Sequence, residues 1–182
     1  AHVPGLVVVA PATPQDNHAL LAAAIACDDP VVYLEHKELW GETADVDPAL
    51  AVPLGRARVC REGTDLTLVS WSRAVGAALL AADEAAAQGR SVEVIDLRTL
   101  WPWDRETVLA SAQRTGRLLV VHEAIEVAGF GAEIAATVAE TLAIRVARLG
   151  APRIPVGYAS TLEAEARVTP MGIRRKIESL FA

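Results

Sequence analysis

The sequence has little of several residue types, and each shortage excludes a class of protein. Only two of its 182 residues are cysteines, Cys27 and Cys60, and their spacing fits neither a zinc site nor a redox motif. Two such thiols favour a reducing compartment, so we expect a cytoplasmic protein. Aromatic residues make up only 4% of a chain that is 52% hydrophobic and rich in alanine. This composition favours an α/β fold over a β-sandwich or a disordered tail.

Runs of positive charge and long apolar runs are scarce as well. The net charge is −6, and the only block of basic residues is Arg174-Arg175-Lys176, which argues against a nucleic-acid partner. No apolar run reaches the roughly 18 residues of a membrane span, and no basic and apolar leader precedes the first strand. We therefore expect neither nucleic acid nor a membrane as a partner.

The clearest feature that is present is a strand, loop and helix in the second half of the chain. Residues Leu118 to Val121 form an apolar, β-branched run typical of a strand buried on both faces. A helical period follows at Ile134, Val138 and Leu142. The polar pair His122-Glu123 falls where this strand ends, which is where open α/β sheets place their functional residues.

We divide the chain at residue 53. In residues 1–53, a strand over Leu6 to Val9 precedes a helix capped by Thr13-Pro14, and a second strand covers Pro30 to Leu34. The helix is expected to bury one face, formed by Leu20, Leu21, Ala24 and Ile25. Such a βαβ unit is too small to fold alone. We therefore expect the chain to dimerise or aggregate; a clean monomer would indicate instead that residues 1–36 dock on the rest of the chain.

Residues 54–182 alternate strands with helices. Strands are expected in residues 54–62, 66–69, 92–95 and 117–121 and near Val146, and the last helix begins after the Thr169-Pro170 cap. The buried stripe of that helix is Ile173, Ile177, Leu180 and Phe181. The order predicts a three-layer fold, a mostly parallel sheet with helices on both faces.

Three of the expected strands end in polar residues, and these ends should share one edge of the sheet. Asp96 and Arg98 follow one strand, His122 and Glu123 follow another, and Ser70-Trp71-Ser72 ends the third. Together they could bind a ligand or a partner loop. The alternative is structural: Asp96 and Arg98 pair with each other and His122 binds a main-chain group. No nucleophile elbow or His/Cys cluster completes a catalytic apparatus.

Five blocks of the chain, in order, resemble a known family. They begin at Pro4, Asp28, Val94, His122 and Gly129, and read PGLVVVAP, DDPVVYLE, VIDLRTL, HEA and GFGAEI. Together they resemble the beta subunit of the thiamine-diphosphate-dependent 2-oxo acid dehydrogenase component. The resemblance covers nearly the whole chain. It implies the end of a transketolase-like pyrimidine-binding domain in residues 1–53 and a transketolase C-terminal domain in residues 54–182.

The resemblance also implies an activity for the parent enzyme. That enzyme oxidatively decarboxylates a 2-oxo acid, of the pyruvate, branched-chain or acetoin type, and transfers the acyl group to lipoamide. It uses thiamine diphosphate and Mg²⁺, held mainly by an alpha subunit in a heterotetramer with a second beta subunit. The family's catalytic glutamate and histidine are expected upstream of this chain, so the fragment alone should be inactive and should not bind the cofactor.

Two sites follow from the resemblance. Main-chain carbonyls that bind K⁺ in similar subunits map to Ala24, Ile25, Cys27 and Asp29. The acyltransferase core is expected to dock near Phe181 and Ala182, and the acidic balance of the chain suits a basic partner module there.

Two other functions remain open at this point. One is a freestanding α/β module for interaction or small-ligand binding, without catalysis. The other is the C-terminal part of another transketolase-like enzyme.

Overall fold

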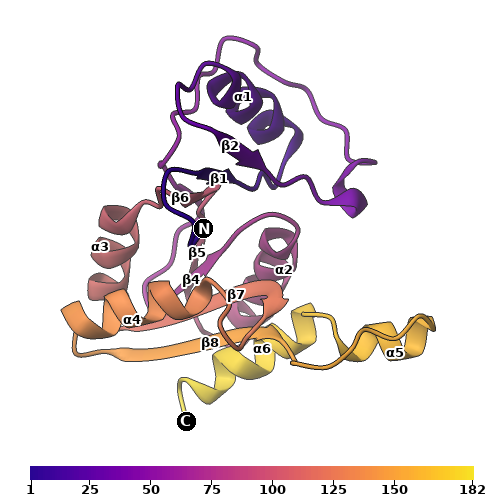
Figure 1. Ribbon diagram of the computed structural model, residues 1–182. Helices are drawn as coiled ribbons and strands as arrows, with labels where there is room; N and C mark the ends of the chain where they lie inside the picture. The colour runs from indigo at the N-terminus through magenta and orange to yellow at the C-terminus, as the bar shows by residue number, and fades with distance from the viewer.

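Two β-sheets, one above the other in Figure 1, organise the structure. The computed structural model describes residues 1–182. The smaller sheet has the strand order β2-β1-β6, and the larger has the order β3-β5-β4-β7-β8. No helix is both long enough and apolar enough to cross a lipid bilayer.

The N-terminal unit is the expected βαβ. It consists of β1 (Val7–Val9), α1 (Pro14–Ile25) and β2 (Val31–Tyr33), with β1 and β2 parallel, followed by the short 3₁₀ helix η1 (Lys37–Leu39). Thr13 caps α1 as predicted, since its hydroxyl accepts the backbone N–H of Asp16 at 3.1 Å.

The buried face of α1 differs from the prediction. Its buried residues are Asp16, Ala19 and Leu20, whereas Leu21 and Ile25 are exposed by 41% and 78%. The apolar pattern did not reveal this rotation because a charged residue, Asp16, occupies the buried side of the first turn. Leu21 and Ile25 instead line an open cavity of about 620 Å³ with Trp40 of the following loop.

The third strand of the smaller sheet comes from the other part of the chain. Strand β6 (Thr99–Trp101) pairs antiparallel with β1, and the Ala10 N–H donates to the Arg98 carbonyl at 2.8 Å. Residues 1–36 therefore dock on the rest of the chain, the alternative to the self-association that the sequence led us to expect. The division at residue 53 consequently passes through a shared sheet.

The larger sheet is the predicted mostly parallel one. Only its edge strand β3 runs antiparallel, against β5. Its strands are β3 (Arg58–Arg61), β4 (Leu66–Ser70), β5 (Val92–Asp96), β7 (Arg117–Ile125) and β8 (Arg145–Ala151).

Helices cover both faces of this sheet. Val108 of α3 and Ile134 of α4 belong to one buried apolar cluster, whereas Ala78 of α2 and Ile173 of α6 belong to another. The three-layer α/β arrangement is thus confirmed. The helices are α2 (Ala74–Ala86), α3 (Arg105–Thr115), α4 (Gly131–Thr141), α5 (Ser160–Glu165) and α6 (Pro170–Ser179).

Candidate functional site

The carboxyl ends of β5 and β7 meet the N-terminal unit, and a group of four charged residues joins the two there. We call Asp16, Arg58, Asp96 and Arg98 the junction tetrad. Asp16 on α1 lies 2.9 Å from a guanidinium nitrogen of Arg58 and 2.9 Å from Nε of Arg98. The same Arg58 nitrogen is 3.6 Å from an Asp96 carboxylate oxygen. Both aspartates are fully buried.

Local backbone geometry positions each member of the tetrad. The Thr13 cap holds Asp16, because the threonine hydroxyl also donates to the Asp16 carboxylate at 2.6 Å. Arg98 adopts a left-handed backbone conformation, with φ of 59°. Its N–H thereby donates to Oδ1 of Asp96 at 3.0 Å. Sequence reasoning identified Asp96 and Arg98 but missed Asp16 and Arg58, which fell within an expected helix and an expected strand.

Burial dominates the electrostatics of the tetrad. Removal of Asp96 from water, together with the nearby charge of Asp16, raises the pKa of its carboxyl group to about 7. Two arginines oppose two acids, so the fully ionised group is neutral. The ion pairs of the tetrad are all within the chain. The role of the tetrad is therefore structural: it holds α1 and β1 against the larger sheet.

His122 lies apart from the tetrad, in a buried cradle of glycines. Its ring stacks on Trp71, with centroids 5.2 Å apart, and its Nδ1 is 2.9 Å from the Ala124 carbonyl oxygen. A Cβ at Gly131 would lie 2.6 Å from its Nε2, so only glycine fits there. Burial lowers the pKa of His122, which favours the neutral ring. The bond to a main-chain group matches the structural alternative considered from the sequence.

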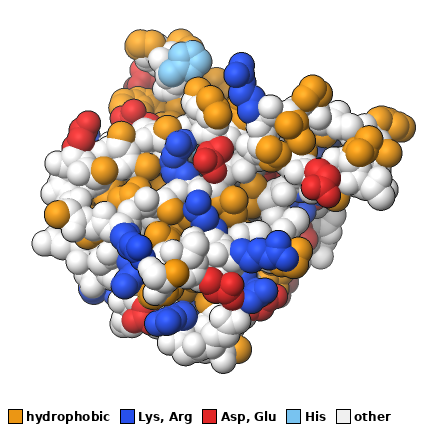
Figure 2. Space-filling view, turned by 90° about the horizontal axis from the view of Figure 1, so that it is seen from below, with side chains coloured by type: hydrophobic (Ala, Val, Ile, Leu, Met, Phe, Trp, Pro, Cys, Tyr) orange, Lys and Arg blue, Asp and Glu red, His pale blue; other side chains and the backbone are white.

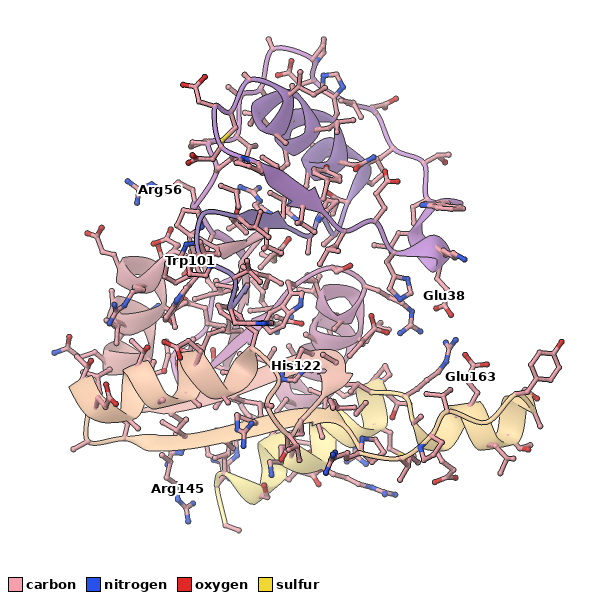
Figure 3. The ribbon with its side chains drawn as sticks, in the orientation of Figure 1. Glu38, Arg56, Trp101, His122, Arg145 and Glu163 are labelled. Atoms are coloured by element: carbon pink, nitrogen blue, oxygen red, sulfur yellow. The ribbon has the colours of Figure 1, made fainter.

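Glu123 belongs to a second charged group. Its carboxylate lies 2.9 Å from Arg73 and 3.2 Å from Nε2 of His36, and Arg73 also contacts Glu38 of η1. Glu38 in turn lies 2.6 Å from Arg167. These exposed ion pairs add a second link between the N-terminal unit and the larger sheet; Figure 3 labels Glu38 on the upper side and His122 on the lower side of this boundary. The four predicted strand-end residues are thus divided among three environments.

The predicted K⁺ ligands lie at the end of α1, which includes Ala24 and Ile25, and in the turn that follows, which includes Cys27 and Asp29. Ala24 accepts the Cys27 N–H at 3.3 Å, whereas the carbonyls of Ile25, Cys27 and Asp29 accept no hydrogen bond from the chain. Free carbonyls at the negative end of a helix suit a monovalent cation. The K⁺ site stays a prediction. The chain has no group of three or more His, Cys, Asp or Glu side chains that could hold a metal ion, and no Mg²⁺-dependent step is assigned to its side chains.

The predicted docking residues Phe181 and Ala182 lie beside several arginines and one carboxylate, Glu178. The guanidinium groups of Arg90 and Arg117 sit over the Phe181 ring, and Arg145 donates to the Ala182 carbonyl at 2.8 Å. The acidic balance of the whole chain, on which that prediction relied, therefore does not hold at this surface.

Comparison with known proteins gives a consistent result. The family model described as "Transketolase, C-terminal domain" matches residues 55–173. The chain is 42% identical over 175 residues to the pyruvate dehydrogenase E1 component subunit beta-2, mitochondrial, of Oryza sativa subsp. japonica, covering 91% of this chain and 46% of that protein. It is also 42% identical over 167 residues to the acetoin:2,6-dichlorophenolindophenol oxidoreductase subunit beta of Cupriavidus necator, covering 89% of this chain and 49% of that protein.

A solved structure extends the comparison to the fold. The structure titled "Split gene transketolase, inactive beta4 tetramer" superposes with a TM-score of 0.85 at 26% identity, over 98% of this chain and 58% of that one. The match includes the N-terminal unit as well as the larger sheet. The chain spans about half the length of the curated relatives it matches.

Proposed function

We propose, from the premise that the chain belongs to the transketolase C-terminal domain family, that it is the C-terminal part of a 2-oxo acid dehydrogenase beta subunit. Its homologues include beta subunits of pyruvate and acetoin enzymes. The parent enzyme would oxidatively decarboxylate a 2-oxo acid and transfer the acyl group to lipoamide. Thiamine diphosphate and Mg²⁺ would be held mainly by the alpha subunit, with K⁺ at the turn after α1.

Within that enzyme we assign an assembly role to the described residues. The proposal rests on the junction, where β6 completes the sheet of β1 and β2 and the tetrad, with its two buried aspartates, joins the two parts. A fixed N-terminal unit would present a constant surface to the alpha subunit, to a second beta subunit and to the acyltransferase core. A cytoplasmic location stays a prediction, since the rice relative is named as mitochondrial.

The test uses the full-length polypeptide that carries this chain, coexpressed with the alpha subunit. Oxidative decarboxylation of pyruvate and 3-methyl-2-oxobutanoate, and oxidative cleavage of acetoin, which has no carboxyl group to lose, are assayed in the presence of thiamine diphosphate. We expect activity with one of the three. Absence of activity with all three, in a complex that assembles and binds thiamine diphosphate, would overturn the assignment to this enzyme class.

The assembly role is tested separately in the same complex. The double variant Arg58→Gln/Arg98→Gln should lower the yield of assembled complex on size-exclusion chromatography. Arg56→Gln is the matched control. The Arg56 side chain is 61% exposed, and its one ion-pair contact, with Asp104, is long at 4.0 Å. Equal yields from the double variant and the control would contradict the role of the tetrad.

A second candidate function is favoured by the solved structure. Because the split-gene transketolase superposes on nearly the whole chain, the chain could be the C-terminal part of another transketolase-like enzyme. Transketolase activity of the full-length protein on a ketose donor and an aldose acceptor, without decarboxylation of 2-oxo acids, would decide for this candidate.

A further inference from the structure

Three arginines converge at the edge of the larger sheet that lies opposite to the junction. Arg117 and Arg145 are the first residues of β7 and β8, and Arg90 lies in the turn between α2 and β5. Arg117 Nε and Arg145 donate to the same carbonyl oxygen, that of Leu180, at 3.2 and 2.9 Å. Figure 3 labels Arg145 at the bottom of the molecule, away from Trp101 of β6.

Phe181 connects the third arginine to the other two. The guanidinium carbons of Arg90 and Arg117 lie 4.4 and 4.6 Å from the centre of its ring. The aromatic ring attracts both cations and thereby holds them near each other. We call Arg90, Arg117 and Arg145 the arginine triad.

No carboxylate side chain of the chain neutralises the triad. Its polar contacts are the main-chain carbonyl of Leu180 and the main-chain oxygen of Ala182, which in the 182-residue chain is part of the terminal carboxylate and faces Arg145. Nearby Arg174 differs, since it pairs with both Glu84 and Glu178. Each guanidinium carries five N–H donors in a planar fork, and most of those in the triad remain free. Like charges held this close repel, so a bound anion would lower the energy of the arrangement.

A shallow groove of about 280 Å³ lies beside the triad. Arg90 and Phe181 line it together with Ala85 and Ile177, and with Arg174 and Glu178, which pair with each other. Figure 2 views the molecule from this side and shows blue Arg and Lys side chains, with red carboxylates beside only some of them. A ligand here would meet cations and, next to them, room for an apolar side chain.

We propose that the arginine triad and its groove bind an acidic segment of a partner protein, with carboxylates on the guanidinium forks and an apolar side chain in the groove. Arginine forks match carboxylates with paired, charge-assisted hydrogen bonds. A nucleic acid fits less well, because three arginines in a chain of net charge −6 make a small footprint. The proposed partner is acidic, whereas the net charge of the chain had suggested a basic partner at this end.

The test measures binding of a short fluorescein-labelled peptide, rich in glutamate and containing one leucine, to the 182-residue chain by fluorescence anisotropy at low salt. We expect binding that weakens as salt is added, because salt screens exposed charges. Arg90→Gln and Arg145→Gln should each weaken binding about tenfold, the change expected from loss of one charge-assisted contact. Arg90→Lys keeps the charge and should lose less.

The matched control is Arg175→Gln, an exposed arginine of α6 that donates only to the Met171 sulfur; its binding should be unchanged. Circular dichroism of each variant checks that the fold is retained. The proposal is overturned if the peptide does not bind, if its glutamine version binds equally well, or if Arg175→Gln costs as much as the triad variants. Binding of transfer RNA or phosphatidylserine vesicles, with no binding of the peptide, would also overturn it.

Discussion

Asp96 is a carboxyl group whose proton affinity is set by its buried position beside Asp16. Its pKa is about 7 when folded, against roughly 4 for an exposed aspartate. The folded chain therefore holds the proton more tightly than the unfolded chain. The stability that this provides is complete below about pH 4 and is lost as the pH rises towards 7.

The variant Asp96→Asn should remove this contribution to the pH dependence. The free energy of unfolding of the unmodified chain, measured by urea titration at several pH values, should fall between pH 4 and 7 more steeply than that of the variant. The difference in slope can reach at most about 1.4 kcal/mol per pH unit for one proton. Asp45→Asn, at an exposed position, is the control. Parallel curves for all three proteins would show that Asp96 does not titrate in this range.

The glycine cradle of His122 gives a second prediction for a single residue. Gly131→Ala would place a Cβ against the buried ring, and overpacking of this kind costs about 1–3 kcal/mol. Gly76→Ala in α2 has no atom within 4 Å of its new Cβ and should instead stabilise by roughly 0.5–1 kcal/mol. Thermal unfolding measures both.

The His122→Ala background identifies the cause of the Gly131→Ala effect. Removal of the ring leaves space for the new methyl group, so Gly131→Ala should cost clearly less there. An undiminished cost in that background would mean that the ring is not what the methyl group meets.

At the scale of elements, α3 packs on the larger sheet partly through a polar group. Glu93 of β5 is almost fully buried and accepts hydrogen bonds from Ser111 and Arg114 of α3. Burial alone would raise the pKa of Glu93, but these two hydrogen bonds and the charge of Arg114 outweigh it and lower the pKa. The negative charge of Glu93 therefore depends on α3.

Arg114→Leu should consequently destabilise the chain by about 1–3 kcal/mol near neutral pH, because it leaves a buried carboxylate with fewer partners. Part of the loss should be recovered in acid, where Glu93 takes up a proton. Arg105→Leu, on the same helix and in contact with the Trp103 ring, serves as the control in urea titrations at two pH values. A loss that is the same at both values would contradict the role assigned to Glu93.

Elements with local signals were predictable from the sequence, and the element that depends on a distant partner was not. The Thr13 and Thr169 caps and the Ile173 and Ile177 stripe predicted α1 and α6, because their causes lie within a few residues. Strand β6 has three residues and no period, and it is a strand only because β1 lies beside it. Asp16 was missed for a similar reason, since its partners Arg58 and Arg98 are distant in sequence.

At the scale of the whole molecule, the junction should make the two parts unfold together. Calorimetry of the 182-residue chain should show one transition, because β1 shares a sheet with β6 and the tetrad, with both aspartates buried, links the parts. Arg58→Gln/Arg98→Gln leaves Asp16 buried without its cations and should split off an earlier transition for the N-terminal unit. Two transitions in the unmodified chain would contradict the coupling.

The shared sheet also makes the segment that connects the two parts less important for holding them together. The segment of residues 42–51 is largely exposed, and it keeps β1 near β6 in the way that a tether raises an effective concentration. Once the sheet has formed, the tether matters less, since β6 and the tetrad retain the N-terminal unit by themselves. A chain cut by a protease within this segment should therefore remain a non-covalent complex of two fragments. Each fragment would bind the other specifically.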